Sequence, residues 1–107
     1  MVEIWYKIVE RDSDETKTLF HGVNRSRLLE KGVWLEAEEK MVRDGSCQTY
    51  YLSGWHILPN KLVAKEYLKR FKNRLELLRI VPCEAKEIRP KAHSNAPVFL
   101  AKWIKLI

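Results

Sequence analysis

The segment YYLSGWHILPNKLVAKEYLKRF, residues 50–71, decides the fold because it joins the clearest strand signal to the clearest helix signal. Aromatic and β-branched residues dominate residues 49–57, which is typical of a strand, and Pro59 ends it. Asn60 is a favourable residue at a helix N-cap. Residues 61–71 then carry apolar side chains at the helical period, which predicts that this face of the helix packs on the core. The apolar positions are Ala64, Tyr67, Leu68 and Phe71.

Further strands are indicated on both sides of this segment. Residues 2–8 alternate between apolar and other side chains at a period of two. Residues 75–85 carry apolar side chains on both faces, which predicts a central strand, and Pro82 within them indicates a bulge or the end of a pairing. Residues 97–107 form a last strand or strand pair that should lie inside the sheet or pair with a second copy of the chain. Gly54 predicts a bulge or a close approach of two backbones.

The connections are less sharply specified. Residues 11–17 read as a polar turn, and residues 18–21 as a short returning strand, so a hairpin is expected. Residues 33–37 are ambiguous between a strand that bends into a helical turn at 36–42 and a helix throughout. Residues 88–95 are expected to form a loop.

This order of elements predicts one domain, residues 1–107, of the α+β class: a mixed, mostly antiparallel sheet with one main helix packed on a face. No apolar run approaches the roughly 20 residues of a membrane span, and the start does not resemble a signal peptide. We therefore expect a cytoplasmic protein with no membrane partner. Cys47 and Cys83 are expected to be free thiols, although a disulfide between them is an alternative. No metal or other cofactor is expected.

The positive charge is concentrated in one part of the sequence. The net charge is +6, and residues 61–91 contain ten basic and four acidic residues, so this window carries the whole excess. Such asymmetry raises the expectation of an anionic partner, either nucleic acid or a nucleotide-like molecule, and a merely solubilising surface is the alternative. The ten basic residues are Lys61, Lys65, Lys69, Arg70, Lys72, Arg74, Arg79, Lys86, Arg89 and Lys91.

Three groups of residues are candidate ligand-binding sites. In a regular strand, Tyr51 and Trp55 share one face and form a platform on which bases can stack, with His56 beside it as a hydrogen-bonding or titrating group. The alternative is that both aromatic side chains belong to the core.

The second candidate is the segment RPKAHS, in which Arg89, Lys91, His93 and Ser94 lie within six residues. The proline between the two cations stiffens the backbone, and an arginine can hold a phosphate through two parallel hydrogen bonds. A plain polar connection between strands is the alternative.

The third candidate is the row of lysines along the predicted helix, which includes Lys65 and Lys69. A spacing of about four residues aligns the ammonium groups on one side of the helix, which suits a phosphate backbone. A solvated helix face has the same pattern.

Residues Leu19, Phe20, His21 and Gly22 resemble the His-Gly strand end of the ADP-ribosyltransferases, in which the histidine meets the nicotinamide ribose. The later Gly54, with an aromatic strand and a tyrosine-bearing helix after it, is similar to the layout of that family. The resemblance implies an enzyme acting on NAD, for which Glu84 and Glu87 are the available candidates for the catalytic glutamate.

A looser resemblance covers most of the chain, in the segments WYKIV, GVWLEA, SGWHI, IRPK and VFLAKWIKL. These are similar to small single-domain proteins of phages and mobile elements, which implies a viral protein that inhibits a host defence system. The leading hypothesis is therefore a non-enzymatic protein that binds an anionic ligand on its basic surface. A protein-protein inhibitor of a host defence complex is the alternative, with Trp5, Trp34 or Trp103 as interface anchors. An ADP-ribosyltransferase-like enzyme is the third reading.

Overall fold

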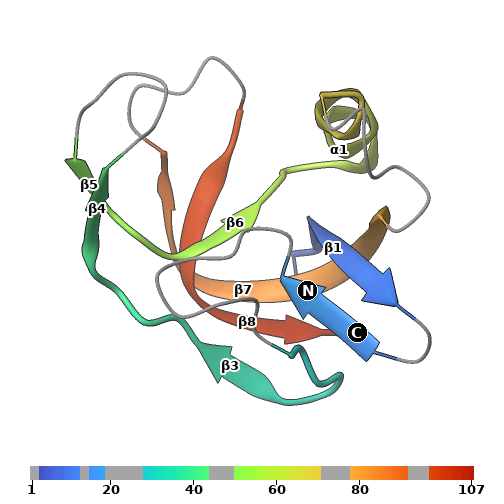
Figure 1. Cartoon of the computed structure of the whole chain (residues 1–107), viewed down its shortest axis with the longest axis horizontal. Helices are drawn as coiled ribbons and strands as arrows, with labels where there is room; N and C mark the ends of the chain where they lie inside the picture. The colour runs from blue at the N-terminus through green and yellow to red at the C-terminus, as the bar shows by residue number, and fades with distance from the viewer. Residues whose placement is uncertain (1–2, 13–14, 19–27, 44–49, 71–77, 92–96) are drawn as a thin grey trace.

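A computed structural model describes residues 3–12, 15–18, 28–43, 50–70, 78–91 and 97–107, and it confirms the expected α+β fold (Figure 1). A mostly antiparallel sheet forms the body, and one helix packs against it. The elements, in chain order, are β1 (Trp5–Asp12), β2 (Glu15–Thr18), β3 (Trp34–Glu36), β4 (Met41–Arg43), β5 (Tyr50–Leu52), β6 (Trp55–Ile57), α1 (Lys61–Leu68), β7 (Leu78–Pro90) and β8 (Phe99–Leu106).

The main sheet closes on itself. Its order is β2-β1-β7-β8-β3, with β6 also paired to β8, so β7 is central as predicted and β8 lies inside the sheet. Beyond the end of β6, Leu58 exchanges two backbone hydrogen bonds with Tyr6 of β1, at 2.9 and 2.7 Å. The strands β1, β7, β8 and β6 therefore form a closed ring, and β2 and β3 remain as the outer strands of the sheet.

Glu87 lies within β7, in the long β7–β8 ribbon, and has a φ of +53°. The ladder pairs Lys86 with Trp103 and resumes with Ile88 opposite Ala101. A positive φ is uncommon for a residue with a side chain. Figure 1 shows both strands of this ribbon bending along their length. The bend lets one ribbon pair with β3 on one arm and with β6 on the other.

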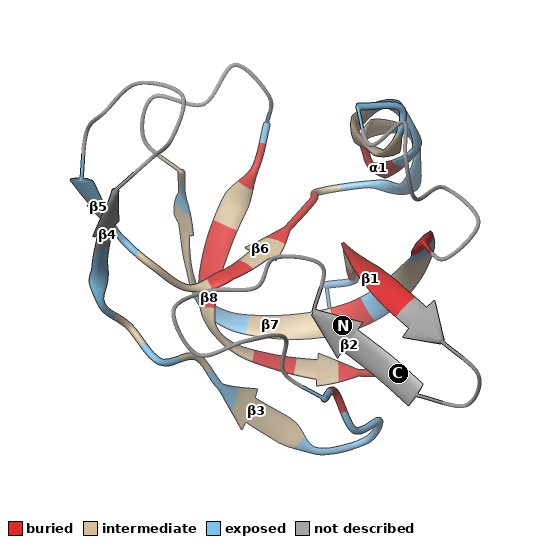
Figure 2. Ribbon diagram, in the orientation of Figure 1, coloured by how far each residue is buried: buried red, intermediate tan, exposed pale blue. Residues whose placement is uncertain are grey.

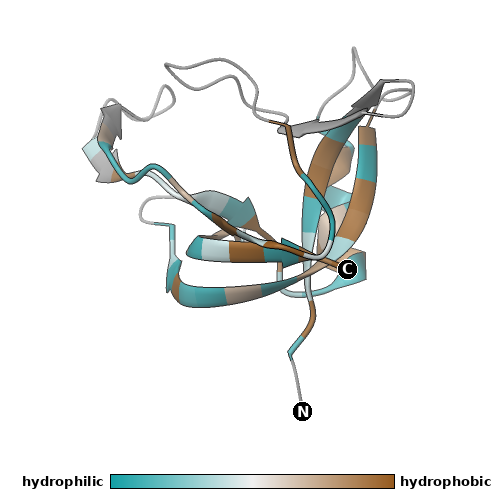
Figure 3. Ribbon diagram, turned by 90° about the horizontal axis from the view of Figure 1, so that it is seen from below, coloured by the Kyte–Doolittle hydropathy of each residue, from teal (hydrophilic) through white to brown (hydrophobic). Residues whose placement is uncertain are grey.

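Two groups of buried residues occupy the two faces of the sheet (Figures 2 and 3). The first lies on the inward face of the ring and the second lies beneath α1. Alternate residues of β1 serve both groups, since Val9 belongs to the first and Ile8 to the second. The first group is Trp5, Val9, Leu29, Trp55, Ile57, Cys83, Ala101, Ile104 and Leu106; the second is Ile8, Leu58, Ala64, Leu78 and Val98.

Helix α1 begins as the sequence predicts. The side-chain oxygen of Asn60 accepts a hydrogen bond from the backbone N–H of Val63 at 2.8 Å, which is the N-cap arrangement. Ala64 is fully buried, and Tyr67 and Leu68 pack against the group beneath the helix. Phe71, also assigned to this face, lies outside the described residues.

Several expected boundaries were wrong. The predicted strand over 49–57 is two strands in different sheets, β5 and β6, because Gly54 passes so close to β8 that a Cβ would lie 3.0 Å from the Ala101 oxygen. The ambiguous segment is strand at β3, and residues 37–40 are not helical. The strand β7 continues through residues 88–90, which were expected to be loop. The N-terminal hairpin exists, but much of the polar turn expected over residues 11–17 is strand, since β1 reaches Asp12 and β2 begins at Glu15; residues 19–21 lie outside the described residues.

Candidate functional site

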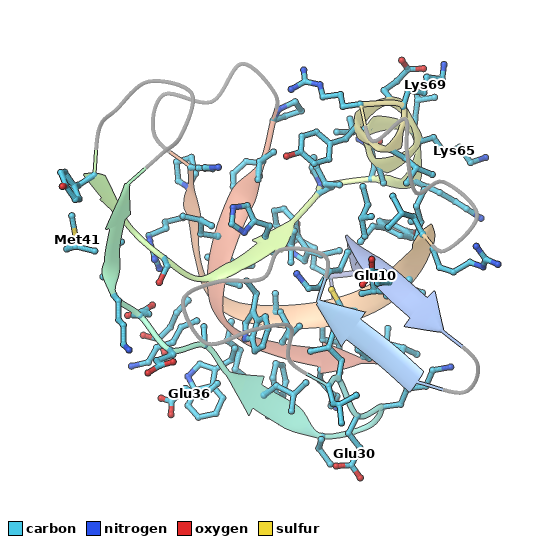
Figure 4. The ribbon with its side chains drawn as sticks, viewed as in Figure 1. Glu10, Glu30, Glu36, Met41, Lys65 and Lys69 are labelled. Atoms are coloured by element: carbon cyan, nitrogen blue, oxygen red, sulfur yellow. The ribbon has the colours of Figure 1, made fainter. Side chains whose placement is uncertain are left out.

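A cationic surface covers the outer side of α1. Residues 61–70 contain four basic side chains, all exposed, and one acidic side chain, Glu66. Glu66 pairs with Lys69 at 3.0 Å, with both groups largely in water, so this pair screens the charge only weakly. Figure 4 shows Lys65 and Lys69 directed away from the sheet. The basic residues of this surface, here named the α1 surface, are Lys61, Lys65, Lys69 and Arg70.

Arg89 is a structural clamp in this arrangement. Its Nη1 donates to Oε1 of Glu39 at 3.1 Å, and its Nη2 donates to the backbone oxygens of Leu52 and Ser53, each at 2.9 Å. The guanidinium thus joins β7 to both ends of the β4–β5 hairpin. The predicted role of Arg89 as a phosphate ligand therefore competes with contacts that hold the fold together.

The other described basic residues of the predicted patch are Arg79, Lys86 and Lys91, and each makes a contact elsewhere; Arg79 donates from Nη1 to the backbone oxygen of Leu78 at 2.7 Å. The ammonium of Lys86 lies 3.9 Å from the centre of the Trp34 ring, at the β3 edge and away from α1. Lys91 is half-buried, and its backbone N–H donates to the oxygen of Val98 at 3.0 Å. Four other members of the predicted sites lie outside the described residues: Lys72, Arg74, His93 and Ser94.

Tyr51 and Trp55 lie on strands of different sheets, so the prediction that they share one strand face was wrong. Trp55 is buried in the ring, and its indole N–H donates to the backbone oxygen of Leu35 at 2.9 Å. Tyr51 is on β5, in the separate two-stranded sheet, and its side chain lies outside the described residues. His56 is half-buried between two inward-facing residues of β6.

Of the three tryptophans considered as interface anchors, Trp5 is buried and therefore unavailable. Trp34 and Trp103 lie half-buried on β3 and β8, on the face opposite the core. Trp103 donates its indole N–H to Oε2 of Glu87 at 3.1 Å, and Lys105 beside Trp34 pairs with Glu84 at 2.7 Å. Opposite charges alternate on this face, so it is closer to neutral than the α1 surface.

Sequence reasoning missed an exposed apolar patch on the β4–β5 hairpin. Met41 and Leu52 are cross-strand partners, and Tyr50 is two residues from Leu52, so all three share one face of the hairpin. Their exposed fractions are 61%, 39% and 67%. The hairpin lies at the edge of the molecule, far from α1 (Figures 1 and 4). In the sequence, this exposed face can be recognised only if residues 50–52 are treated as a strand separate from β6.

Sequence reasoning also missed a buried lysine. Lys7 is only 5% exposed, and burial lowers the pKa of its ammonium from 10.5 to about 8, against a small opposing effect of the Cys83 thiol. Burial likewise raises the pKa of Cys83 from 9.0 to about 11, and Lys7 opposes that shift. The sequence could have indicated this burial, because Lys7 lies between Trp5 and Val9 on the same face of the strand.

Few of the described side chains are suited to catalysis or metal binding. His21, Gly22 and Cys47 lie outside the described residues, and Cys83 is a buried free thiol. Within the part of the chain that the structure describes, no three histidine, cysteine or acidic side chains form a group that could hold a metal ion. The same described residues include no helix with the length and apolar character needed to cross a membrane.

None of the known protein families, curated proteins or solved structures matches this chain, so the geometry alone supports a function.

Proposed function

We propose that this chain is a non-enzymatic binding protein that holds a nucleic acid through the α1 surface. The observation that carries the proposal is the row of exposed lysines at positions 61, 65 and 69 on one helix. Four residues of α-helix advance about 6 Å, so the row offers three ammonium groups at regular intervals along an extended polyanion.

The electrostatics of α1 support a polyanion over a small ligand. Among the described residues, no carboxylate pairs with Lys61 or Lys65, and the single acidic group of the helix lies at its exposed face beside Lys69. Exposed cations of this kind gain free energy mainly by releasing counterions from phosphates, and they impose no sequence preference. We therefore expect binding that is strongly salt-dependent and tolerant of sequence.

The proposed biological role is to occupy a nucleic-acid path needed by a host defence system. This setting is an expectation from the sequence alone. The structure contributes a helix anchored by an N-cap and a buried alanine, which supports a preformed binding surface.

Fluorescence anisotropy with a labelled single-stranded oligonucleotide tests the proposal. The variant Lys61→Gln/Lys65→Gln/Lys69→Gln should weaken binding and reduce the slope of log affinity against log salt by about 2, since each lost phosphate contact on a single strand contributes about 0.7. The matched control is Lys31→Gln/Lys40→Gln/Lys86→Gln, which removes the same charge from exposed positions outside α1. Equal weakening by both triple variants, or no binding by the native protein at low salt, would contradict the proposal.

A second candidate function is a protein-protein inhibitor, which the hairpin patch of Met41, Tyr50 and Leu52 favours. Methionine and tyrosine are enriched in protein interfaces, and an exposed apolar hairpin face is unusual on a monomer. Capture of a host protein that survives nuclease treatment, and that is lost in Met41→Ser/Tyr50→Ser but not in the α1 triple variant, would favour this function.

A further inference from the structure

Two hydrogen-bond donors on the inward face of β1 are buried, and neither belongs to the α1 surface. Trp5 and Lys7 are two residues apart on one strand, so their side chains project to the same side. They are 8% and 5% exposed. The indole nitrogen of Trp5 is buried and donates no hydrogen bond to any group that the structure describes. A buried donor without a partner is costly and calls for an explanation.

The ammonium of Lys7 is also incompletely satisfied. It carries three N–H donors. One is directed to the backbone oxygen of His56 at 3.1 Å, and the face of the Trp55 ring lies 5.5 Å from the nitrogen. In the described portion of the chain, no carboxylate forms an ion pair with it. A buried ammonium is normally paired, because removing it from water without a counter-ion costs several kcal/mol.

The neighbouring groups do not provide the missing negative charge. Cys83 on β7 faces Lys7, and its thiol is uncharged at neutral pH because burial raises its pKa to about 11. Glu10, labelled in Figure 4, is at an alternate position of β1 and projects to the opposite face with Ile8. His56 on β6 offers its backbone oxygen, which is neutral.

We propose that the ring encloses a binding site for one small oxyanion, whose oxygens accept hydrogen bonds from Nζ of Lys7 and Nε1 of Trp5. The two side chains leave the same face of β1 from alternate residues and are both buried, so their donors can reach the oxygens of one carboxylate or phosphate group inside the ring. The site is distinct from the α1 surface: it takes one ligand of defined stoichiometry inside the ring rather than a polyanion outside it.

The test uses the ¹⁵N-labelled full chain at pH 6.5 and follows the indole N–H resonance of Trp5. Acetate and inorganic phosphate are titrated separately, with chloride at equal ionic strength as the control. A saturable shift with acetate alone assigns a carboxylate ligand, a shift with phosphate alone assigns a phosphate ligand, and a shift with both supports the broader oxyanion class. No saturable shift beyond that caused by chloride overturns the proposal.

Two variants locate the site. Lys7→Met should raise the apparent Kd for the oxyanion at least tenfold, whereas Lys65→Met, which removes the same charge from α1, should leave it unchanged. If Lys7→Met does not fold, the pH dependence of binding by the native protein tests the proposal instead. Oxyanion binding should weaken at least tenfold between pH 6.5 and pH 10 as Lys7 loses its proton. Affinity that survives either change overturns the proposal. Oligonucleotide binding is a separate readout, so this site and the α1 surface succeed or fail independently.

Discussion

The guanidinium of Arg89 meets the carboxylate of Glu39 at 3.1 Å, and this contact joins the central strand to the segment that leads into β4. Both side chains are largely removed from water, with exposed fractions of 32% and 23%. The same guanidinium also holds two backbone oxygens at the end of β5. A two-stranded hairpin is marginally stable alone, so the β4–β5 hairpin depends on this clamp for its position.

Arg89→Met should therefore destabilise the chain. Three hydrogen bonds from a charged donor are lost, and Glu39 is left half-buried without its partner, so we expect the free energy of unfolding to fall by about 2–4 kcal/mol. Urea denaturation measures the change. Relative to the native protein, the variant should show a larger increase in amide hydrogen exchange in β4 and β5 than in β7. The control is Arg70→Met, just beyond the end of α1, where the arginine is exposed and lies over the Tyr67 ring; it should change stability by less than about 1 kcal/mol.

The buried ammonium of Lys7 should make stability depend on alkaline pH. The unfolded chain binds this proton up to about pH 10.5, whereas the folded chain releases it near pH 8. Below pH 8 both states are protonated and burial costs about 3 kcal/mol; between pH 8 and 10.5 only the unfolded state binds the proton, so stability rises with pH. Cys83 acts oppositely, because its raised pKa removes stability between about pH 9 and 11.

Comparison with Lys7→Met reports the lysine together with its coupling to Cys83, because Lys7 lowers the pKa of that thiol. We expect the variant to be more stable than the native protein at pH 7, and this advantage to shrink between pH 8 and 10.5. Urea denaturation at several pH values measures it. An advantage that stays constant over that range would mean that Lys7 keeps its ordinary pKa.

Gly54 and Gly32 should tolerate alanine differently. A Cβ at Gly54 would lie 3.0 Å from the backbone oxygen of Ala101, so Gly54→Ala must displace β6 from β8, at a cost of about 1–3 kcal/mol. Gly32 has open space but a φ of +79°, so Gly32→Ala costs only the strain of that conformation, about 1–2 kcal/mol. Hydrogen exchange distinguishes the two, because only Gly54→Ala should loosen the amides of β6.

The corner at Glu87 should be sensitive to the shape of the side chain. Glu87→Val and Glu87→Gly both remove the acceptor for Trp103, so the loss of that hydrogen bond cancels in their comparison and the tolerance of each residue for a positive φ contributes to the difference. We expect valine to be less stable than glycine by about 1–2 kcal/mol, because a β-branched residue is strained at positive φ. Thermal unfolding of both variants measures this, and equal stability would show that the corner carries no strain.

The sequence by itself determined the elements whose signals are local. The N-cap of Asn60, the apolar stripe of α1 and the apolar residues on both faces of β7 each follow from neighbours in the chain, and the structure confirms them. The α+β class followed from the same signals. The exposure of the lysines on α1 was predictable for the same reason, because the helical period separates them from Ala64 and Tyr67.

Only the tertiary structure determined which side chains contact residues that are distant in the sequence. Arg89 and Leu52 are 37 residues apart, and Lys7 and His56 are 49 apart, so no local pattern could show that one cation clamps a hairpin and the other is buried. The break between β5 and β6 has the same origin, since it arises where Gly54 meets the backbone of β8. The charge and the apolar periodicity are properties of the sequence. The burial of a side chain and its hydrogen-bond or ion-pair partners depend on how the closed ring brings distant strands together.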